Sequence, residues 1–309
     1  MRAALDRALA SVAAQNKNIM VVVGDVSPIA LGTFTKDFSD RFVNIGIAEA
    51  NMVSFGAGLA LSGKIPFLFT IATFMTFRCY EQIRDDVCFQ NLNVKIIGGG
   101  GGFVYSTLGA THHATEDYAV MRVLPHMVVL APVDPFETEH AVSAMARHVG
   151  PAYLRLGRSG DTDIYTEEQR KKYKFEIGKA ITLRSGKDIA LISASSILKN
   201  VLSAADKLSV SGIEAEVINM HTIKPIDREA VLQAAKKCKA IITVEEHQRI
   251  GGLGSAVAEI LAEEKAEVNF RSMGIRDMFL NNLYGSRDYL LEKAGLGVDD
   301  IIKAVKSIV

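Results

Sequence analysis

RFVNIGIAEANMVSFGAGLALSG, residues 41–63, joins a short apolar segment to an apolar helix through a single acid. The segment FVNIGI predicts a β-strand, and the Ala, Met, Val, Phe and Leu residues that follow it predict a helix. The acid, Glu49, stands where that helix begins. A carboxylate in such surroundings is costly unless it is paired or keeps its proton. The ordinary explanation is a helix-terminal acid favoured by the macrodipole, so the rest of the chain must decide the role of Glu49.

The same order of strand and helix continues on both sides of this stretch. Apolar spacing predicts a helix over Arg2–Ala14, and the β-branched run Ile19–Pro28 predicts a strand that ends at Gly24-Asp25. Further strands are predicted at Ile65–Ala72, at Asn93–Gly101, in MVVLAP and in PAYLRLGR, which ends at Arg158. Continuous apolar strands that alternate with helices are typical of a parallel sheet buried on both faces.

A polar segment, Ser159–Tyr173, separates this half from a second pattern of the same kind. In the second half, strands are predicted in DIALISASS, EAEVINMHTIKP, AIITVEEH and EVNFRSMGI. A chain of 309 residues is long enough for about two domains. We therefore predict an α/β protein in which residues 1–160 form one domain, 161–174 a linker and 175–309 a smaller domain.

Composition limits the possible partners. The chain is 49% hydrophobic and 23% charged, and 35 basic residues balance 35 acidic ones. A net charge of zero gives no electrostatic reason to expect nucleic acid or an anionic membrane as a partner. Near-neutrality with a mean hydropathy of +0.17 instead indicates that another chain covers part of the apolar surface. The three cysteines form no CxxC, and neither a signal peptide nor a membrane-spanning run is seen, so we expect a cytoplasmic protein.

Common catalytic motifs are absent from the sequence. GxxxxGKS/T, HExxH and GxSxG do not occur, and the glycines of Gly251–Gly254 lack GxGxxG spacing and predict a tight turn with close helix packing. Because adjacent histidines point in different directions, we expect no metal at His112-His113. Phe74, Phe77 and Tyr80 recur three residues apart, a spacing that by itself indicates core packing.

Taken together and in this order, the motifs resemble the transketolase family of thiamine-diphosphate enzymes. The first half resembles its pyrimidine-binding domain and the second half its C-terminal domain. GDVSP, which contains Asp25, is similar to a segment where an aspartate approaches the cofactor. NIGIAEANM resembles the family's hallmark stretch, so Glu49 is implied to be the acid that activates the aminopyrimidine ring. TFMTFRCY resembles the aromatic segment around that ring and implies roles for Phe74, Phe77 and Tyr80.

Other resemblances concern the substrate. ATHH is similar to a Thr-His pair whose histidine meets the sugar, which implies that His112 binds or exchanges protons with a substrate oxygen. LGR resembles a strand end whose arginine, here Arg158, binds the substrate's phosphate. Arg2 stands at the family's distance before Asp25 for a second such arginine. A guanidinium suits a phosphate because it offers paired donors and a permanent charge.

The family's diphosphate-binding domain, with its GDG…N motif, has no counterpart here, since Asp25 lies in GDV. The chain therefore resembles the C-terminal subunit of a split transketolase. The resemblance implies an N-terminal partner subunit that holds the diphosphate with Mg²⁺ or Ca²⁺, and a heterotetramer of two long and two short chains. It implies transfer of a two-carbon ketol unit from a phosphorylated ketose to an aldose, as in the pentose phosphate pathway.

The sequence departs from the family's pattern at three places that concern the substrate. A serine is missing near Ile29, a histidine is replaced within Gly98–Gly102, and an aspartate is replaced near Leu108. The donor and the acceptor are therefore left open. Two alternatives share the domain pair: the beta subunit of a 2-oxoacid dehydrogenase, or an enzyme similar to deoxyxylulose-phosphate synthase. A third is a non-catalytic regulatory subunit, which the intact Glu49 disfavours.

Overall fold

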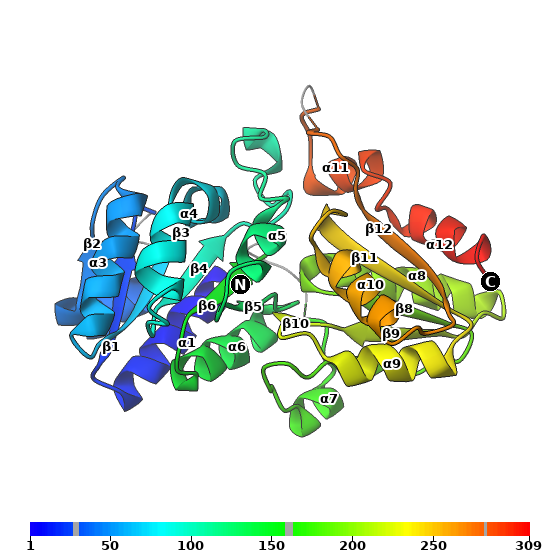
Figure 1. Ribbon diagram of the computed structural model, residues 1–309, viewed down its shortest axis with the longest axis horizontal. Coiled ribbons are helices and arrows are strands. Elements are labelled where there is room, and N and C mark those ends of the chain that lie inside the picture. The colour runs from blue at the N-terminus through cyan, green and yellow to red at the C-terminus, as the bar shows by residue number, and fades with distance from the viewer. Residues whose placement is uncertain (27–30, 158–162, 281–282) are drawn as a thin grey trace. The chain divides into compact units, whose positions relative to one another are not determined.

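The structure, a computed structural model, describes residues 1–26, 31–157, 163–280 and 283–309. Contacts divide the chain into two compact units. The first comprises Met1–Gly101 with Val120–Ile177, and the second comprises Gly102–Ala119 with Gly178–Val309. Each unit is a sheet flanked by helices, which confirms the predicted two-domain α/β class (Figure 1). The predicted boundaries at residues 160 and 175 stay a prediction.

Six parallel strands form the sheet of the first unit, in the order β5-β6-β4-β3-β1-β2. They are β1 (Ile19–Val23), β2 (Phe42–Asn44), β3 (Ile65–Ile71), β4 (Lys95–Gly99), β5 (Val128–Leu130) and β6 (Ala152–Leu156). Val21 of β1 lies between Phe42 and Phe67 of its two neighbours. Since β4, β5 and β6 are buried at every position, their apolar runs are explained by cover on both faces.

Helices cover this sheet (Figure 1). They are α1 (Arg2–Gln15), α2 (Gly32–Asp37), α3 (Glu49–Leu61), α4 (Tyr80–Gln82), α6 (Pro135–Arg147) and α7 (Glu167–Lys172), with the 3-10 turn η2 (Ser39–Arg41) and the π-helices η3 (Phe74–Arg78) and η4 (Ile83–Cys88). α1 packs against α6, and α3 packs on β3. A Cβ atom at Gly56 of α3 would lie 2.9 Å from Leu68 Cδ1, so glycine permits the close approach of α3 to the sheet. α5 (Asp117–Arg122) spans the division between the units.

Two buried aspartates fix helix starts in this unit. The oxygens of Asp6 on α1 accept hydrogen bonds from the backbone N–H groups of Thr33 and Phe34, both at 2.9 Å. Asp134 caps α6 by accepting the N–H of Glu137 at 2.7 Å, with Pro135 at the first position of the helix. Asp134 and Pro135 together therefore fix the start of α6.

The described part of the predicted linker packs on the first unit. The hydroxyls of Tyr165 and Tyr173 both donate to Glu137 Oε1, each at 2.7 Å, and Glu137 is fully buried. The ring of Phe136 packs against both tyrosine rings, with centroids 5.7 Å and 5.0 Å away. Residues 163–177 are thus held by specific side-chain bonds, although their polar composition is that of a solvated segment.

The sheet of the second unit has five strands in the order β12-β11-β8-β9-β7, and the short strand β10 is not part of it. The strands of this unit are β7 (Ile181–Arg184), β8 (Ile189–Ser193), β9 (Ala215–Asn219), β10 (Thr222–Lys224), β11 (Ala240–Gln248) and β12 (Asn269–Ile275). β8, β9, β11 and β12 are parallel, whereas β7, which was not predicted, runs antiparallel to β9. The chain starts the parallel part at β8, goes to β9 on one side and then crosses to β11 on the other.

Its helices are α8 (Leu198–Val210), α9 (Arg228–Lys237), α10 (Leu253–Glu263), α11 (Arg287–Lys293) and α12 (Val298–Lys306), with the 3-10 turns η5 (Ser106–Leu108) and η6 (Ser195–Ile197). α8 packs against α12, and α9 packs against α10. Gly251 has φ +75° and Gly252 precedes α10, which confirms the predicted turn at Gly251–Gly254. In the described part of the chain, no helix has the length and apolar character needed to cross a membrane.

Candidate functional site

Three of the predicted site residues follow the carboxyl ends of neighbouring strands in the first unit. Asp25 follows β1, Glu49 follows β2, and Phe74 follows β3. Because β1 pairs with both β2 and β3 in parallel, these ends meet at one edge of the sheet. Ligands of open α/β sheets bind at this edge. The structure therefore provides the shared location that the sequence motifs require.

Glu49 is buried, and Arg78 pairs with it. The glutamate residue is 2% exposed, and its Oε2 accepts a hydrogen bond from Arg78 Nη1 at 2.8 Å. The guanidinium of Arg78, half-exposed, also lies 4.3 Å from the centre of the Phe74 ring. This ion pair offsets part of the free energy that is needed to bury the carboxylate of Glu49. Sequence reasoning missed Arg78, although it is the one cation within TFMTFRCY.

A small polar recess adjoins Glu49. A Cβ atom at Gly24 would lie 3.4 Å from both Glu49 Cγ and Thr70 Oγ1. Thr70 is fully buried at the end of β3, and its hydroxyl has no hydrogen-bond partner among the described residues. A buried polar atom without a partner is uncommon in proteins and is often explained by an absent ligand or water. Gly24 and Thr70 are thus further candidates for the site, which sequence reasoning also missed.

Asp25 is held in an unusual backbone conformation. Its φ of +53° lies in the left-handed region, which Asp and Asn tolerate better than most residues. Its N–H donates to Asn44 Oδ1 at 3.1 Å, and Asn44 Nδ2 donates to Asp25 Oδ1 at 3.3 Å. Asn44 Oδ1 also accepts the N–H of Gly46 at 3.0 Å. Asn44 therefore ties the turn of Asp25 to the turn that leads into Glu49, and β2 ends at Asn44 instead of continuing to residue 47 as predicted.

The aromatic segment is π-helical over Phe74–Arg78 instead of forming a regular helix, and a second π-helix follows it at Ile83–Cys88. Thr76 Oγ1 donates to Ala72 O at 2.8 Å and Cys79 Sγ to Phe74 O at 3.2 Å, so side chains take backbone carbonyls there. Met75, Thr76 and Cys79 are buried, whereas Phe77 is 41% exposed and Phe74 is half-buried. The aromatic residues thus lie off the buried face, and the interpretation of their spacing as core packing alone is wrong.

Electrostatics around this segment follow from burial. Burial, with a smaller effect from the Glu49 carboxylate, raises the pKa of the Cys79 thiol to about 12, and the guanidinium of Arg78 opposes this. Burial also raises the pKa of Tyr80, which is half-buried. Both groups are therefore neutral at physiological pH.

His112 belongs to the second unit, in the segment Gly102–Ala119. Its Nδ1 lies 3.0 Å from Thr111 Oγ1, and the Tyr105 ring lies edge-on to it at 6.1 Å. His113 is buried and contacts Ser106 O through Nε2 at 3.2 Å, so the two histidines have separate surroundings. Burial lowers the pKa of His113.

The two phosphate-binding candidates differ in what the structure describes. Arg2 is half-buried in the first turn of α1. The neighbouring Met1 Sδ accepts a hydrogen bond from the N–H of Gly157 at 3.0 Å, just beyond β6. Arg2 therefore starts close to the carboxyl end of β6. Arg158 lies outside the described residues.

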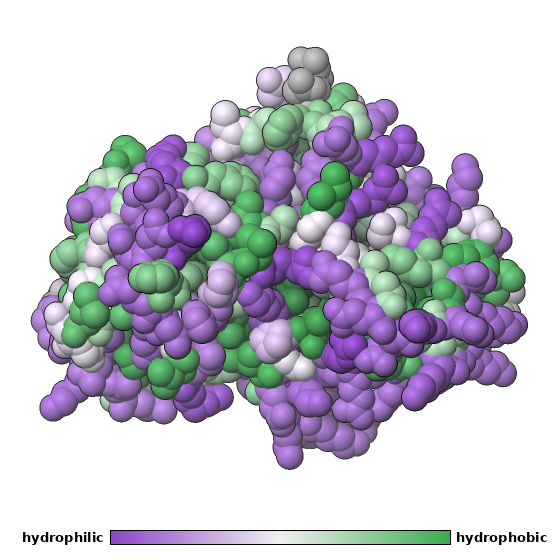
Figure 2. All heavy atoms as spheres, in the orientation of Figure 1, coloured by the Kyte–Doolittle hydropathy of each residue, from purple (hydrophilic) through white to green (hydrophobic). Residues whose placement is uncertain are grey.

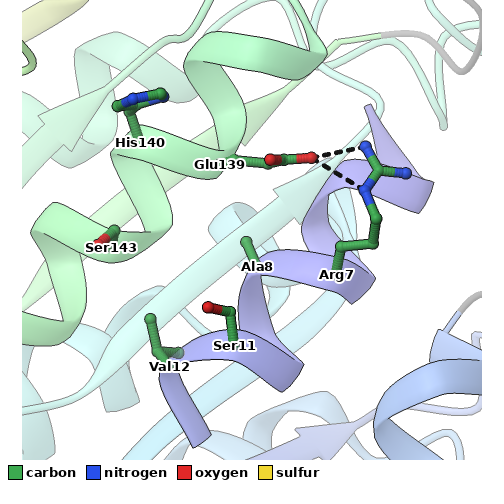
Figure 3. Close-up of a pocket in the computed structure, with 7 residues that line it drawn as sticks. All are labelled: Arg7, Ala8, Ser11, Val12, Glu139, His140 and Ser143. Carbon is green, nitrogen blue, oxygen red and sulfur yellow. Dashed lines mark hydrogen bonds and ion pairs between the residues drawn. The ribbon is translucent and has the colours of Figure 1, made fainter. Parts of the chain in front are cut away.

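Two surface hollows of the first unit lie elsewhere. One, with a volume of about 340 Å³, runs between α1 and α6, and Figure 3 shows Arg7 and Glu139 joined across it. The other, of about 460 Å³, is lined by Lys17, Met20, Asp40, Arg41 and Lys64. Neither is lined by a predicted site residue.

Comparison with known proteins gives a consistent assignment. Residues 1–160 match the transketolase pyrimidine-binding domain and residues 178–301 the transketolase C-terminal domain. An apulose-4-phosphate transketolase subunit of Actinobacillus succinogenes is 38% identical over 94% of this chain and 92% of its own. The 6-deoxy-6-sulfo-D-fructose transketolase subunit SqwH of Clostridium sp. is 40% identical over 89% of this chain and 83% of its own. A solved structure, "Split gene transketolase, inactive beta4 tetramer", is 40% identical, with a TM-score of 0.90 over 99% of this chain and 96% of that chain.

A pyrimidine-binding domain of this family implies thiamine diphosphate as the cofactor. The carboxyl edge of the strands fits its aminopyrimidine end, because this edge carries a buried carboxyl group (Glu49), a buried threonine hydroxyl without a partner among the described residues (Thr70), and aromatic residues that are only partly buried (Phe74 and Phe77). Carboxyl and hydroxyl groups are suited to contact ring nitrogens, and aromatic side chains are suited to contact the faces of a ring. Sequence match, fold and site chemistry agree: the chain belongs to the transketolase family.

Proposed function

We propose that this chain is the C-terminal subunit of a cytoplasmic, two-subunit transketolase. It would transfer a two-carbon ketol unit from a phosphorylated ketose to an aldose. The observation that carries this proposal is the buried Glu49 at the start of α3, paired with Arg78 at the carboxyl edge of the sheet. A carboxyl group at this edge, next to aromatic rings, suits proton exchange with a heterocyclic base.

In the reaction, thiamine diphosphate supplies a nucleophilic carbon, and the protein supplies orientation and proton management. Arg78 orients the carboxyl group of Glu49 through Oε2, and we assign the proton exchange with the pyrimidine ring nitrogen to Oε1. Phe74, Phe77 and Tyr80 would pack against the bound ring and exclude water. Asp25, whose turn is held by Asn44, would contact the cofactor from the end of β1.

Substrate contacts are assigned to three residues. His112 exchanges a proton with a substrate oxygen, and Arg2 and Arg158 bind an anionic tail. Two relatives are named for an apulose phosphate and for a sulfofructose, both of which carry an anionic group. These names support an anionic tail. The departures near Ile29, Gly100 and Leu108 leave the identity of the sugar open.

A partner subunit completes the proposed site by holding the diphosphate and its Mg²⁺ or Ca²⁺ through a GDG…N motif. Large apolar side chains are exposed on α3 and on the segments that flank the site. They include Ile47, Phe55, Phe77 and Phe89. Figure 2 shows that hydrophobic residues reach the surface at several places on the face in view of the first unit. Exposed apolar side chains of this kind are stabilised when another chain covers them, so they support assembly with a partner. We propose an α2β2 stoichiometry for the assembly.

The test is reconstitution with the product of a neighbouring gene that carries GDG…N. In the pair, Glu49→Gln should leave cofactor binding largely intact and slow the C2 proton exchange of thiamine by about 100-fold or more. The control Glu81→Gln, which changes an exposed acid of α4, should exchange the C2 proton at the wild-type rate. The chain alone should bind thiamine diphosphate weakly. Wild-type exchange in the Glu49 variant would remove Glu49 from this role.

A further inference from the structure

Three ionisable side chains in succession are buried at the carboxyl end of β11. Glu245, Glu246 and His247 are 1%, 4% and 0% exposed. Burying charged groups is costly unless each has well-placed partners. Two of these three residues have their partners in the segment Gly102–Ala119, which carries His112 and belongs to this same unit.

Glu246 holds the start of that segment. Its Oε1 accepts the N–H of Phe103 at 2.7 Å. Arg287, from the start of α11, donates through Nε to both carboxylate oxygens, at 3.0 and 3.1 Å, and through Nη2 to Ser196 Oγ at 3.1 Å. A carboxylate fixed by a two-pronged arginine has little freedom to move. The N–H of Phe103 is therefore bound to a rigid group.

The segment is closed at its neck and leaves no room there for a side chain. Gly102 and Ala114 exchange two backbone hydrogen bonds, at 2.8 and 3.1 Å. Gly102 has φ +62°, and a Cβ atom on it would lie 2.5–2.6 Å from atoms of Glu246. Only glycine combines this backbone conformation with contact to the carboxylate. Residues 103–113, which lie between Gly102 and Ala114, thus form a loop whose first residue is held by Glu246.

His247 and Gln248 hold the far end of the segment. The N–H of Gln248 donates to Thr115 O at 2.7 Å, and His247 Nε2 accepts the N–H of Ala119 at 3.3 Å. The Tyr118 ring stacks on His247, with 5.0 Å between centroids and 16° between planes. Both ends of the segment are therefore bound to β11.

Inside the loop, contacts run from Glu246 towards His112. The Phe103 ring, whose N–H is held by Glu246, packs edge-on against His113 at 5.2 Å. His113 contacts Ser106 O across the loop. His112 directly precedes His113 in the chain, so its backbone is fixed by the same contacts. The loop is held at the carboxyl end of β11, the neighbour of β8 in the sheet. The strand order reverses between β8 and β11, and open α/β sheets bind ligands at such a point.

We propose that Glu246, fixed by Arg287, is a positioning residue for His112. In this arrangement the second unit has a defined task, which is to hold the substrate-contacting loop in place from β11. The role of the loop in substrate binding rests on the proposed function, whereas the anchoring itself does not.

The anchoring is tested first, on the full chain without a partner. The rate at which the backbone amides of residues 103–113 exchange hydrogen with solvent should rise at least about tenfold in Glu246→Gln and in Arg287→Lys. Glu245→Gln is the matched control, because Glu245 is equally buried on the same strand but accepts the N–H groups of Leu253 and Gly254 in α10. The control should loosen the start of α10 and leave the loop unchanged. Wild-type exchange of the loop in both Glu246→Gln and Arg287→Lys would overturn the proposal.

The route through His112 is tested in the reconstituted enzyme. Glu246→Gln should lower kcat/KM for the ketose donor about tenfold or more, chiefly through KM, while Glu245→Gln retains the wild-type value. In a His112→Ala background, Glu246→Gln should add little further loss. If the reduction of kcat/KM in the double variant equals the product of the reductions in the two single variants, Glu246 does not act through His112. A wild-type pair without transferase activity contradicts the proposed function, and the exchange comparison then still decides the anchoring.

Discussion

Arg78 Nη1 lies 2.8 Å from Glu49 Oε2 and thereby ties the start of α3 to the aromatic segment that follows β3. The two ends of this pair have very different surroundings, since the side chain of Glu49 is 3% exposed and that of Arg78 is 48% exposed. The guanidinium reaches the buried acid while it lies over the Phe74 ring. A single arginine therefore neutralises Glu49 and orients an aromatic residue of the proposed cofactor site.

Arg78→Met should destabilise the chain, because it leaves the Glu49 carboxylate buried without its cation. We expect a loss of roughly 1–2 kcal/mol in the free energy of unfolding, less than for a fully buried pair since solvent screens the exposed arginine. Urea denaturation of the chain measures this.

Arg84→Met is the matched control, because Arg84 pairs with Asp85 at the surface and should change stability by less than about 0.5 kcal/mol. Adding Glu49→Gln to Arg78→Met should restore part of the loss. Equal effects of Arg78→Met and Arg84→Met would mean that the pair with Glu49 contributes no more than an exposed one.

Local patterns predicted most of the fold, because a buried parallel strand needs a continuous apolar run and each run occurs at the predicted place. The helix after Glu49 was likewise predictable from its apolar residues. The π-helical turns were not, since they depend on Thr76 and Cys79 finding particular carbonyls.

Partners distant in sequence were also beyond prediction. Arg78 is 29 residues from Glu49, and Phe103 is 143 residues from Glu246. No local pattern encodes such pairs. The sequence motifs thus indicated candidate residues for the site, and the fold showed which side chains hold them.

Cysteine labelling provides a test of burial near Glu49. Burial raises the pKa of Cys79 to about 12 and that of Cys238 to about 11, so both thiols stay protonated at pH 8. Since the thiolate is the reactive form, a thiol reagent at pH 8 should label the folded chain at least about 100-fold more slowly than the chain in urea. A variant that retains only Cys79 isolates its contribution. Rapid labelling of this folded variant would contradict the burial of Cys79 beside Glu49.

Lys95 at the start of β4 predicts a pH dependence of stability. It is fully buried, donates to His148 O at 2.8 Å and Gly150 O at 2.7 Å, and burial lowers its pKa from 10.5 to about 7. Between pH 7 and 10.5 the unfolded chain binds a proton at Lys95 that the folded chain lacks, so the stability contribution of Lys95 rises with pH. A neutral amine keeps two N–H donors, which suffice for both carbonyls.

The wild type should therefore gain roughly 2–3 kcal/mol relative to Lys95→Met between pH 7 and 9.5, measured by urea denaturation at each pH. Burial also lowers the pKa of the nearby His148, so its titration falls below this window. A difference between wild type and Lys95→Met that stays constant with pH would show that Lys95 remains charged in the folded chain.

Tyr173 tests whether residues 163–177 are fixed on the first unit. Its hydroxyl donates to the buried Glu137 Oε1 at 2.7 Å, and burial with the Glu137 carboxylate raises the pKa of Tyr173. Tyr173→Phe removes this bond to a charged acceptor and should cost about 1–2 kcal/mol. Trypsin should then cut after Lys171 and Lys172 several-fold faster than in the wild type, as followed by mass spectrometry.

Tyr284→Phe, which alters a tyrosine that is 74% exposed, should leave the cleavage rate unchanged. If Tyr173→Phe and wild type are cut at the same rate, the tyrosine bonds to Glu137 do not hold this segment, and its polar composition describes it better.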